Sequence, residues 1–269
     1  MPSRLTVLCL LTVLIPTARA ADAPPAIPDN AAPRTLFLIG DSTVKNGSGK
    51  GADGLWGWGD FLAAHFDKSK ITIANRALGG RSSRTYFSEG LWDKTLAAIK
   101  PGDFVIMQFG HNDGGPLSGP KARASIKGTG DETQTITDEK TNKPEIVHSY
   151  GWYLRKYVTD AKAKGATPII CSPIPRNMWK DDKVLRADRD YGKWAAEIAE
   201  SQHVPFINLN DLIATRYESL GQDKVSAFFP KEHTHTNEAG ARLNAAIVAD
   251  AIKSLKTAPL SAAVIEPRP

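Results

Sequence analysis

Short apolar runs alternate with longer amphipathic stretches along the chain, and this alternation limits the possible folds more than any other feature of the sequence. Runs typical of β-strands occupy residues 35–39, 71–74, 103–109, 167–172 and 204–208. Several of them are apolar almost throughout, as expected for strands that are covered on both faces of a sheet. Such strands need helices on both sides.

Stretches with helical periodicity fill the intervals between the apolar runs. Gly165 follows one of these stretches, in the position of a helix-ending glycine. Because strands and helices alternate, the sequence predicts an α/β fold with a parallel sheet and helices on both faces. The expected helices lie near residues 58–67, 91–99, 149–164, 184–202, 210–220 and 237–255.

The first twenty residues have the features of a secretory signal peptide. Arg4 precedes an uncharged apolar run over residues 5–15, and Ala18-Arg19-Ala20 forms a small-x-small cleavage site. The apolar run is too short to span a bilayer, and no lipoprotein-type cysteine follows it. We therefore expect an exported protein, either periplasmic or secreted, and no membrane anchor.

The rest of the chain is expected to form one domain with two flanking segments. Residues 21–34 are rich in Pro and Ala and predict a spacer, residues 35–257 predict the globular domain, and residues 258–269 predict a loose tail. The interval 114–147 is rich in Gly, Thr, Lys and Asp. A loop of this length in a compact domain is usually functional or disordered.

Charge and cysteine content exclude some classes of protein. The formal net charge is +5 and falls to +3 without Arg4 and Arg19. No basic stripe accompanies it, so we expect no nucleic-acid partner. Loss of Cys9 with the signal peptide leaves Cys171 alone in an apolar run, where a buried, inert thiol is expected. We further expect a monomer.

Polar residues follow three of the expected strands. Gly40-Asp41-Ser42-Thr43 comes directly after the first apolar run, Leu78-Gly79-Gly80-Arg81 shortly after the second, and Gly110-His111-Asn112-Asp113 after the third. Ligands of open parallel sheets bind beyond the carboxyl ends of the strands. We therefore expect these three segments to meet at one edge of the sheet.

Ser42 and His235 are the candidate nucleophile and base. A serine hydroxyl becomes a useful nucleophile when a histidine takes its proton, and a carboxylate can then orient the imidazole. Glu232 precedes His235 by three residues, so both side chains can meet on one turn. Taken alone, Ser42 is better explained as a turn residue or a helix cap, which are common roles of serine. His233 and His235 could also bind a metal, but no third ligand stands at motif spacing.

Gly80 and Asn112 are candidate donors to an oxyanion. A backbone N–H at a glycine and a side-chain amide are typical of such sites. Each also has an ordinary structural explanation, since Gly80 could serve a plain turn and Asn112 an Asx-turn.

Taken together, these four blocks in this order resemble the SGNH (GDSL-type) hydrolases, over nearly the whole chain after the signal peptide. The serine is not part of a Gly-x-Ser-x-Gly elbow, so the chain does not resemble an α/β-hydrolase lipase. The rhamnogalacturonan acetylesterase branch is the most similar. The stretches that carry this resemblance are Gly40-Asp41-Ser42-Thr43, Gly57-Trp58-Gly59-Asp60, Gly80-Arg81-Ser82-Ser83-Arg84, Phe109-Gly110-His111-Asn112-Asp113-Gly114-Gly115 and Phe229-Pro230 with His233-Thr234-His235-Thr236.

The resemblance implies a three-layer α/β/α sandwich, related to flavodoxin-like folds, around a five-stranded parallel sheet. It implies that Ser42 is the nucleophile, that His235 is the base, and that the oxyanion hole consists of the Ser42 backbone, Gly80 and Asn112. No metal or organic cofactor is expected. The family usually has Asp where this chain has Glu232, which still supplies a carboxylate and is the expected acid.

The expected function is removal of acetyl groups from a plant cell-wall polysaccharide, namely rhamnogalacturonan in pectin. Trp58, Arg81 and Trp179 lie at the expected active edge and are candidate substrate-binding residues, although the tryptophans could be core residues and the arginine could be ion-paired or solvated. A xylan acetylesterase and a lipid or thioester hydrolase are the alternatives. A non-catalytic sugar-binding relative would be expected to have lost Ser42, Asn112 or His235.

Overall fold

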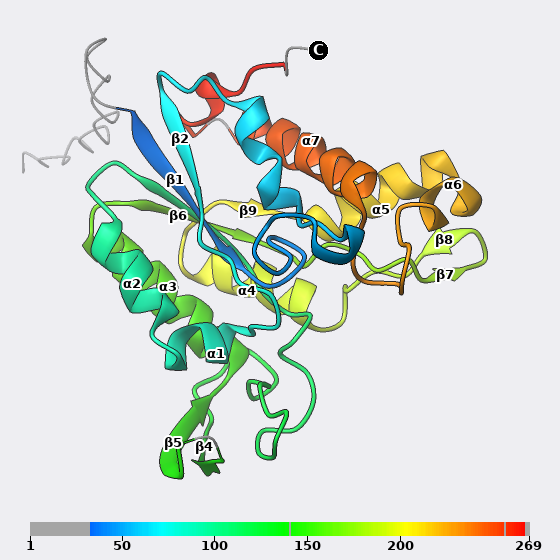
Figure 1. Ribbon diagram of the computed structural model, residues 1–269. Coiled ribbons are helices and arrows are strands. Elements are labelled where there is room, and N and C mark those ends of the chain that lie inside the picture. Colours follow the sequence, from blue (N-terminus) through cyan, green and yellow to red (C-terminus); the bar gives the residue numbers. More distant parts are fainter. Residues whose placement is uncertain (1–32, 140, 256, 267–269) are drawn as a thin grey trace, which may run out of the picture. The chain divides into compact units, whose positions relative to one another are not determined.

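The computed structural model describes residues 33–139, 141–255 and 257–266 (Figure 1). The predicted signal peptide and all but the last two residues of the predicted spacer lie outside the described residues. Five parallel strands form one sheet in the order β2-β1-β3-β6-β9, which confirms the predicted fold class. These strands are β1 (Arg34–Gly40), β2 (Ile71–Asn75), β3 (Phe104–Gln108), β6 (Thr167–Cys171) and β9 (Phe206–Ile207).

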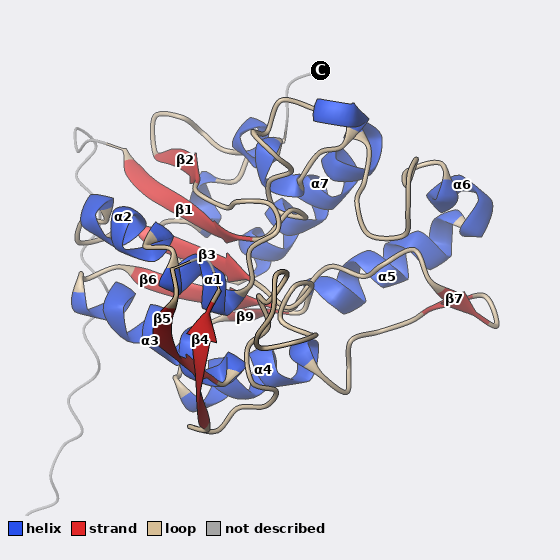
Figure 2. Cartoon of the chain, turned by 60° about the horizontal axis from the view of Figure 1, so that its bottom comes forward, coloured by secondary structure: helices blue, strands red, loops and turns tan. Residues whose placement is uncertain are grey.

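The apolar strands are continuous because both faces of the sheet are covered. Leu36 and Leu38 pack on one side, and Phe37 and Ile39 pack on the other. Helices α5 and α7 cover the first face, and helices α1, α2, α3 and α4 cover the second (Figure 2). The helices are α1 (Ser83–Ser88), α2 (Leu91–Ala98), α3 (Tyr150–Ala163), α4 (Tyr191–Ser201), α5 (Leu209–Leu220), α6 (Gln222–Ser226) and α7 (Glu238–Ser254).

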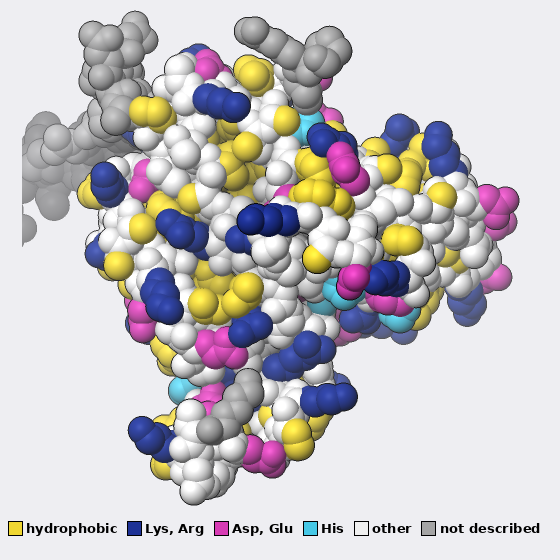
Figure 3. All heavy atoms as spheres, in the orientation of Figure 1, with side chains coloured by type: hydrophobic (Ala, Val, Ile, Leu, Met, Phe, Trp, Pro, Cys, Tyr) yellow, Lys and Arg dark blue, Asp and Glu magenta, His cyan; other side chains and the backbone are white. Residues whose placement is uncertain are grey.

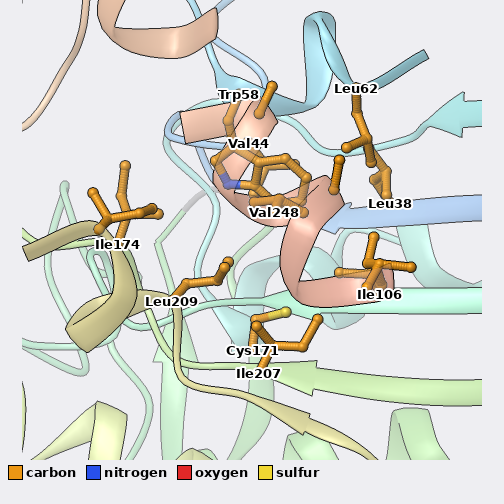
Figure 4. Close-up of a cluster of buried hydrophobic side chains, with 14 of the residues drawn as sticks. Leu38, Val44, Trp58, Leu62, Ile106, Cys171, Ile174, Ile207, Leu209 and Val248 are labelled. Carbon is orange, nitrogen blue, oxygen red and sulfur yellow. The ribbon is translucent and has the colours of Figure 1, made fainter. Parts of the chain in front are cut away.

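Cys171 lies within the first of these two layers, as the sequence predicted. Its side chain is 1% exposed and packs in the cluster that includes Leu38, Ile106 and Ile207 (Figure 4). Burial raises the pKa of its thiol far above the ordinary value, so the reactive thiolate is suppressed.

The segment 58–67 is not the predicted α-helix. It forms two 3-10 turns, η2 (Trp58–Asp60) and η3 (Leu62–His65). A Cβ at Gly57 would lie 2.3 Å from the Val44 carbonyl. Only glycine allows the two backbones to approach so closely. The helical prediction was based on the spacing of apolar residues, which contains no information on this long-range contact.

The segment 184–202 was predicted to be helical over too long a range. Helix α4 begins only at Tyr191, and the residues before it include a two-stranded ribbon. Its strands are β7 (Trp179–Lys180) and β8 (Lys183–Val184).

Helices α1 and α6 are short and were not predicted. Ser82 caps α1 by accepting a hydrogen bond from the Thr85 backbone N–H.

The interval 114–147 is more ordered than predicted, because its second half forms an antiparallel hairpin of β4 (Thr133–Asp138) and β5 (Lys143–His148).

The predicted loose tail is also wrong for its described part. Leu260 is fully buried, and a 3-10 turn, η4 (Ser261–Ala263), follows it. The backbone N–H of Ile265 donates to His65 O at 2.9 Å, so this segment is fastened to the domain. One further 3-10 turn is η1 (Ala52–Gly54).

Candidate active site

Ser42 stands in a tight turn directly after β1. The backbone N–H groups of Val44 and Lys45 both donate to Asp41 O, at 3.2 and 3.1 Å. The fully buried Asp41 carboxylate accepts from the Thr43 N–H at 2.8 Å and from its hydroxyl at 2.7 Å. Ser42 itself is half-buried. The turn thus holds the Ser42 side chain at the carboxyl edge of the sheet on a rigid support.

Trp58 belongs to that support and not to a sugar-binding surface. Its side chain is 1% exposed, and its indole N–H donates to Gln108 Oε1 at 2.9 Å. The Gln108 amide in turn donates to Thr43 Oγ1 at 2.6 Å. The prediction that Trp58 contacts substrate is therefore wrong, because a side chain buried in this way cannot reach a polysaccharide. The residue instead braces the turn that carries Ser42.

His235 lies between Ser42 and Glu232. Its Nε2 atom is 2.7 Å from Ser42 Oγ, and its Nδ1 atom is 2.6 Å from Glu232 Oε1. Ser42 and His235 come from opposite ends of the chain, and the fold brings them into contact. In this geometry the imidazole can take a proton from the hydroxyl on one side while the carboxylate fixes its tautomer on the other.

The turn that carries His235 is fixed by backbone contacts on both sides. The Asn177 N–H donates to His233 O at 2.8 Å, and the Trp56 N–H donates to Thr236 O at 2.9 Å. Asn237 then caps α7 by accepting from the Gly240 N–H at 3.0 Å. The imidazole is consequently positioned by its own backbone as well as by its side-chain partners.

Glu232 folds back on this same turn. Its two oxygens accept the backbone N–H groups of Thr234 and His235 at 2.8 and 2.7 Å. Burial is the largest single influence and raises the pKa of Glu232, but these N–H groups and the His235 imidazole together outweigh it, so the pKa lies below its usual value. The glutamate side chain thus reaches His235 as a carboxylate, in the place where the resemblance to SGNH hydrolases implies an aspartate.

Two backbone N–H groups near Ser42 are available to an incoming ligand. Within the described part of the chain, neither the Ser42 N–H nor the Gly80 N–H donates to a protein acceptor. Gly80 has φ +76°, a left-handed conformation that favours glycine. A Cβ on the preceding Gly79 would lie 3.5 Å from Ser42 Cβ, which shows how closely this turn approaches the serine.

Asn112 lies beside the same turn. Its side-chain amide donates one hydrogen bond to Arg81 O at 2.9 Å, so its second N–H remains to be used. The Arg81 guanidinium is occupied by Glu89 at 2.8 Å and by Gly79 O at 3.0 Å. In the structure, Arg81 therefore orients Asn112 through its carbonyl, while its side-chain charge is already paired.

Asp113 ties these segments together beneath the surface. Its buried carboxylate accepts from the backbone N–H and hydroxyl of Ser83 and from the hydroxyl of Ser125. Burial raises the pKa of Asp113 to about 6, although these hydrogen bonds act in the opposite direction. The neighbouring His111 is also enclosed, and burial lowers the pKa of its imidazole.

Two cavities flank the hydrogen-bonded group, and both include Gly114 in their walls. One, of about 400 Å³, lies beside His111 and Arg176. The other, of about 420 Å³, lies beside Gly80. Trp179 does not line either cavity: it is half-buried, packs against the core cluster beneath α5 and α7, and donates its indole N–H to Asn177 Oδ1 at 2.7 Å.

The arrangement suits acyl transfer through a serine. It contains a hydroxyl, a base in contact with it, an acid behind the base, and N–H groups near the serine that have no acceptor among the described residues. Within the described ranges, no three His, Cys, Asp or Glu side chains group closely enough to hold a metal ion. No helix among the described residues combines the length and apolar character needed to cross a membrane.

Sequence reasoning missed the buried network under Ser42. Gln108 could have been found, because it is a polar residue at the end of an otherwise apolar, two-face-buried strand, and a buried amide needs partners. Its partner Trp58 carries no such signal, since an isolated tryptophan between two glycines is compatible with a loop as well as with the core.

Comparisons with known proteins show the family of this chain. Residues 38–243 match the GDSL-like Lipase/Acylhydrolase family. A rhamnogalacturonan acetylesterase from Emericella nidulans is 34% identical over 223 residues, which cover 82% of this chain and 84% of the relative. YesY of Bacillus subtilis, described as a probable rhamnogalacturonan acetylesterase, is 31% identical over 242 residues, covering 87% of this chain and 98% of the relative.

Solved structures share the fold. The crystal structure of Bacillus subtilis YxiM superposes with a TM-score of 0.68 at 24% identity and covers 84% of this chain, which spans 58% of that structure. Axe2, an acetylxylan esterase from Geobacillus stearothermophilus, superposes with a TM-score of 0.53 at 18% identity, covering 83% of this chain and 95% of that one. At these identities the likeness shows the architecture alone. With the family match and the two relatives above 30% identity, the chain belongs to the GDSL-like lipase/acylhydrolase family.

Proposed function

We propose that this chain is an exported carbohydrate O-acetylesterase that removes acetyl groups from rhamnogalacturonan. The observation that carries the proposal is the continuous contact from Glu232 through His235 to Ser42, beside two backbone N–H groups that have no acceptor among the described residues. Two relatives above 30% identity bear the name rhamnogalacturonan acetylesterase. They support this polymer over xylan.

In the first half of the proposed reaction, the enzyme is acetylated. Ser42 Oγ attacks the acetyl carbonyl carbon while His235 Nε2 takes its proton. The negative charge on the carbonyl oxygen is stabilised by the N–H groups of Ser42 and Gly80 and by the Asn112 amide. When the tetrahedral intermediate collapses, the bond to the sugar oxygen breaks, and the imidazolium returns its proton to that oxygen.

In the second half, water restores the serine. His235 removes a proton from water as the water oxygen attacks the acetyl-enzyme carbonyl. Collapse of the second intermediate breaks the bond to Ser42 Oγ, which regains its proton from His235, and acetate leaves. Glu232 stays ionised throughout and stabilises the imidazolium.

The walls of the site favour a sugar over a lipid. The cavity beside Gly80 includes Arg81, Lys121 and Arg123. The cavity beside His111 combines Arg176 and Asp190 with apolar side chains that include Ile174, Met178 and Leu185. A site for long acyl chains would be lined mostly by apolar side chains. A lipid or thioester hydrolase is therefore the less well supported alternative.

Export and a monomeric state complete the proposal. The predicted signal peptide over residues 1–20 supports a protein that works outside the cytoplasm. Intact-mass measurement of the exported protein tests the first part, since cleavage after Ala20 leaves a chain that starts at Ala21. Light scattering after size-exclusion chromatography tests the second part.

The decisive experiment measures acetate release from acetylated rhamnogalacturonan and acetylated xylan, and hydrolysis of a long-chain p-nitrophenyl ester. Wild-type protein and Ser42→Ala are compared. We expect fast release from the pectic polymer and none from the variant. Activity on the long-chain ester alone would refute the substrate, and release that survives Ser42→Ala would refute the mechanism.

A further inference from the structure

The first half of the interval 114–147 forms one wall of the cavity beside Gly80. This cavity, of about 420 Å³, is lined on one side by Gly80 and Arg81 and on the other by Lys121 and Arg123. The sequence of this interval is rich in Gly, Thr, Lys and Asp and does not indicate a particular ligand. In the structure it brings two cations to the turn that supplies a proposed oxyanion donor.

The charges in this cavity do not balance. Arg81 is paired with Glu89, whose carboxylate also lines the cavity. In contrast, no carboxylate in the described part of the chain forms an ion pair with Lys121 or Arg123. Dark-blue Lys and Arg side chains gather on the face shown in Figure 3, over the loops between the edge of the sheet and the β4–β5 hairpin. Two positive charges therefore face solvent beside the site.

Arg123 is the nearer of the two to the reacting centre. Its Nη1 atom lies 3.4 Å from Gly80 O, and it lies 3.8 Å from the position that a Cβ on residue 80 would occupy. This one contact is long for a hydrogen bond. Because the Gly80 N–H is the proposed oxyanion donor, this guanidinium stands in the same cavity lining as the group that the acetyl carbonyl would contact.

The loop that carries these cations is built into the domain. The Arg123 carbonyl accepts a hydrogen bond from the Ser82 hydroxyl. Arg84, which is 3% exposed, donates to the carbonyls of Leu117 and Ala124 at 2.8 and 3.0 Å. Arg84 is itself held by Glu145 through two contacts of 2.9 and 2.6 Å. The backbone under Lys121 and Arg123 is thus fixed at both ends, while their side chains remain exposed.

We infer that Lys121 and Arg123 bind the carboxylate of a uronic acid residue in the substrate, either on the acetylated sugar or on its neighbour. The inference rests on the proposed function, since rhamnogalacturonan contains uronic acid. A guanidinium can hold a carboxylate through two parallel hydrogen bonds, and an ammonium beside it adds a point charge. The two residues would be specificity determinants, because a neutral polymer offers them no partner.

The contact should act on substrate binding more than on the chemical step. A carboxylate remote from the ester makes the same contact in the ground state and in the transition state, so its loss raises KM and leaves kcat nearly unchanged. Both cations are exposed, so added salt should screen them and weaken the same effect.

The test compares four proteins on three substrates. The proteins are the wild type, Arg123→Ala, the double variant Lys121→Ala with Arg123→Ala, and a matched control, Lys68→Ala with Lys100→Ala. Lys68 and Lys100 are exposed and stand at the opposite edge of the sheet, before β2 and β3, so the control removes the same charge. The substrates are an acetylated rhamnogalacturonan oligosaccharide, the same oligosaccharide with its carboxylates methyl-esterified, and p-nitrophenyl acetate.

We expect the double variant to lose roughly 30-fold in kcat/KM on the acidic oligosaccharide, and Arg123→Ala alone roughly 10-fold, mostly through KM. The double variant should stay within about twofold of wild type on the other two substrates. Wild-type activity on the acidic oligosaccharide should fall with added salt, and activity of the double variant should not. The control should match wild type throughout.

Three outcomes would contradict parts of this scheme separately. Equal losses on the acidic and methyl-esterified oligosaccharides would overturn the carboxylate contact. An equal loss of activity on all three substrates would also overturn the carboxylate contact and would indicate a structural role for the loop. In that case Arg123→Lys, which keeps the positive charge, would be as inactive as Arg123→Ala. If the wild type hydrolyses p-nitrophenyl acetate but releases nothing from either oligosaccharide, the proposed function itself fails.

Discussion

Replacing Trp58 with phenylalanine tests whether this residue braces the nucleophile turn. The change removes the indole N–H that Gln108 Oε1 accepts at 2.9 Å, and both side chains are almost fully buried. A buried acceptor left without its donor costs about 1–3 kcal/mol. The smaller ring adds a cavity term of about 1 kcal/mol. We therefore expect the free energy of unfolding to fall by about 2–4 kcal/mol.

The expected loss is measurable by heat and by kinetics. For a domain of this size it corresponds to a decrease in Tm of roughly 6–12 °C. Below the transition, kcat should fall several-fold because Gln108 also holds Thr43 in the turn of Ser42, while KM for the oligosaccharide should stay constant. Differential scanning calorimetry and initial rates measure these quantities.

A matched control is Trp194→Phe. Trp194 is half-buried on α4, and its indole makes no hydrogen bond among the described contacts. We expect this variant to lose less than half as much stability as Trp58→Phe. An unchanged Tm for Trp58→Phe together with a raised KM would refute the bracing role and would restore Trp58 as a substrate contact.

Three further predictions concern the site and its support. Glu232→Gln keeps the size of the side chain but removes the charge behind His235, so kcat should fall roughly 10³-fold while the circular dichroism spectrum stays unchanged; near-normal kcat would exclude Glu232 as the acid. Gly80→Ala forces a side chain into the left-handed region at φ +76°, which should cost about 1–2 kcal/mol in urea unfolding and roughly tenfold in kcat as the N–H shifts; full activity would argue against this donor. Asp113 has a pKa raised from 3.8 to about 6, so its ionisation weakens the native state. Its contribution to stability should be complete below about pH 4 and should fall by about 3 kcal/mol as the pH rises through 6 to about 7, and the difference in unfolding free energy between wild type and Asp113→Asn should change by that amount over this range. A difference independent of pH would contradict the raised pKa.

The sheet was predictable because the signal that specifies it is local and redundant. Each strand is a short apolar run. Successive residues such as Leu36 and Phe37 are both apolar because they are buried on opposite faces of the sheet. Chain order then places Ser42, Gly80 and Asn112 at one edge, since parallel strands present their carboxyl ends together. The position of His235 followed from the motif blocks and not from strand order.

The parts that were mispredicted depend on contacts between distant segments. The helix expected over residues 58–67 fails because Gly57 must approach the Val44 carbonyl, and no periodicity reports that distance. The sequence leaves Trp58 open between substrate contact and core, because its hydrogen-bond partner Gln108 lies fifty residues away. The tail was expected to be loose because Ala and Pro dominate it, although one residue, Leu260, fills a place in the core.

Residues 80–84 position both the proposed oxyanion donor and the loop that carries Lys121 and Arg123. The backbone at the donor and the backbone under the two cations therefore cannot change independently. Gly80 supplies the proposed donor, Ser82 holds the carbonyl of Arg123, and Arg84 fixes the backbone on both sides of Lys121. Asp113 then joins this block to the segment that carries Asn112 through Ser83. A change in the backbone of residues 80–84 would therefore displace the donor and the cations together. The exposed side chains of Lys121 and Arg123 are therefore positions at which specificity for a charged polymer can be altered independently of catalysis, because the proposed catalytic steps do not use them.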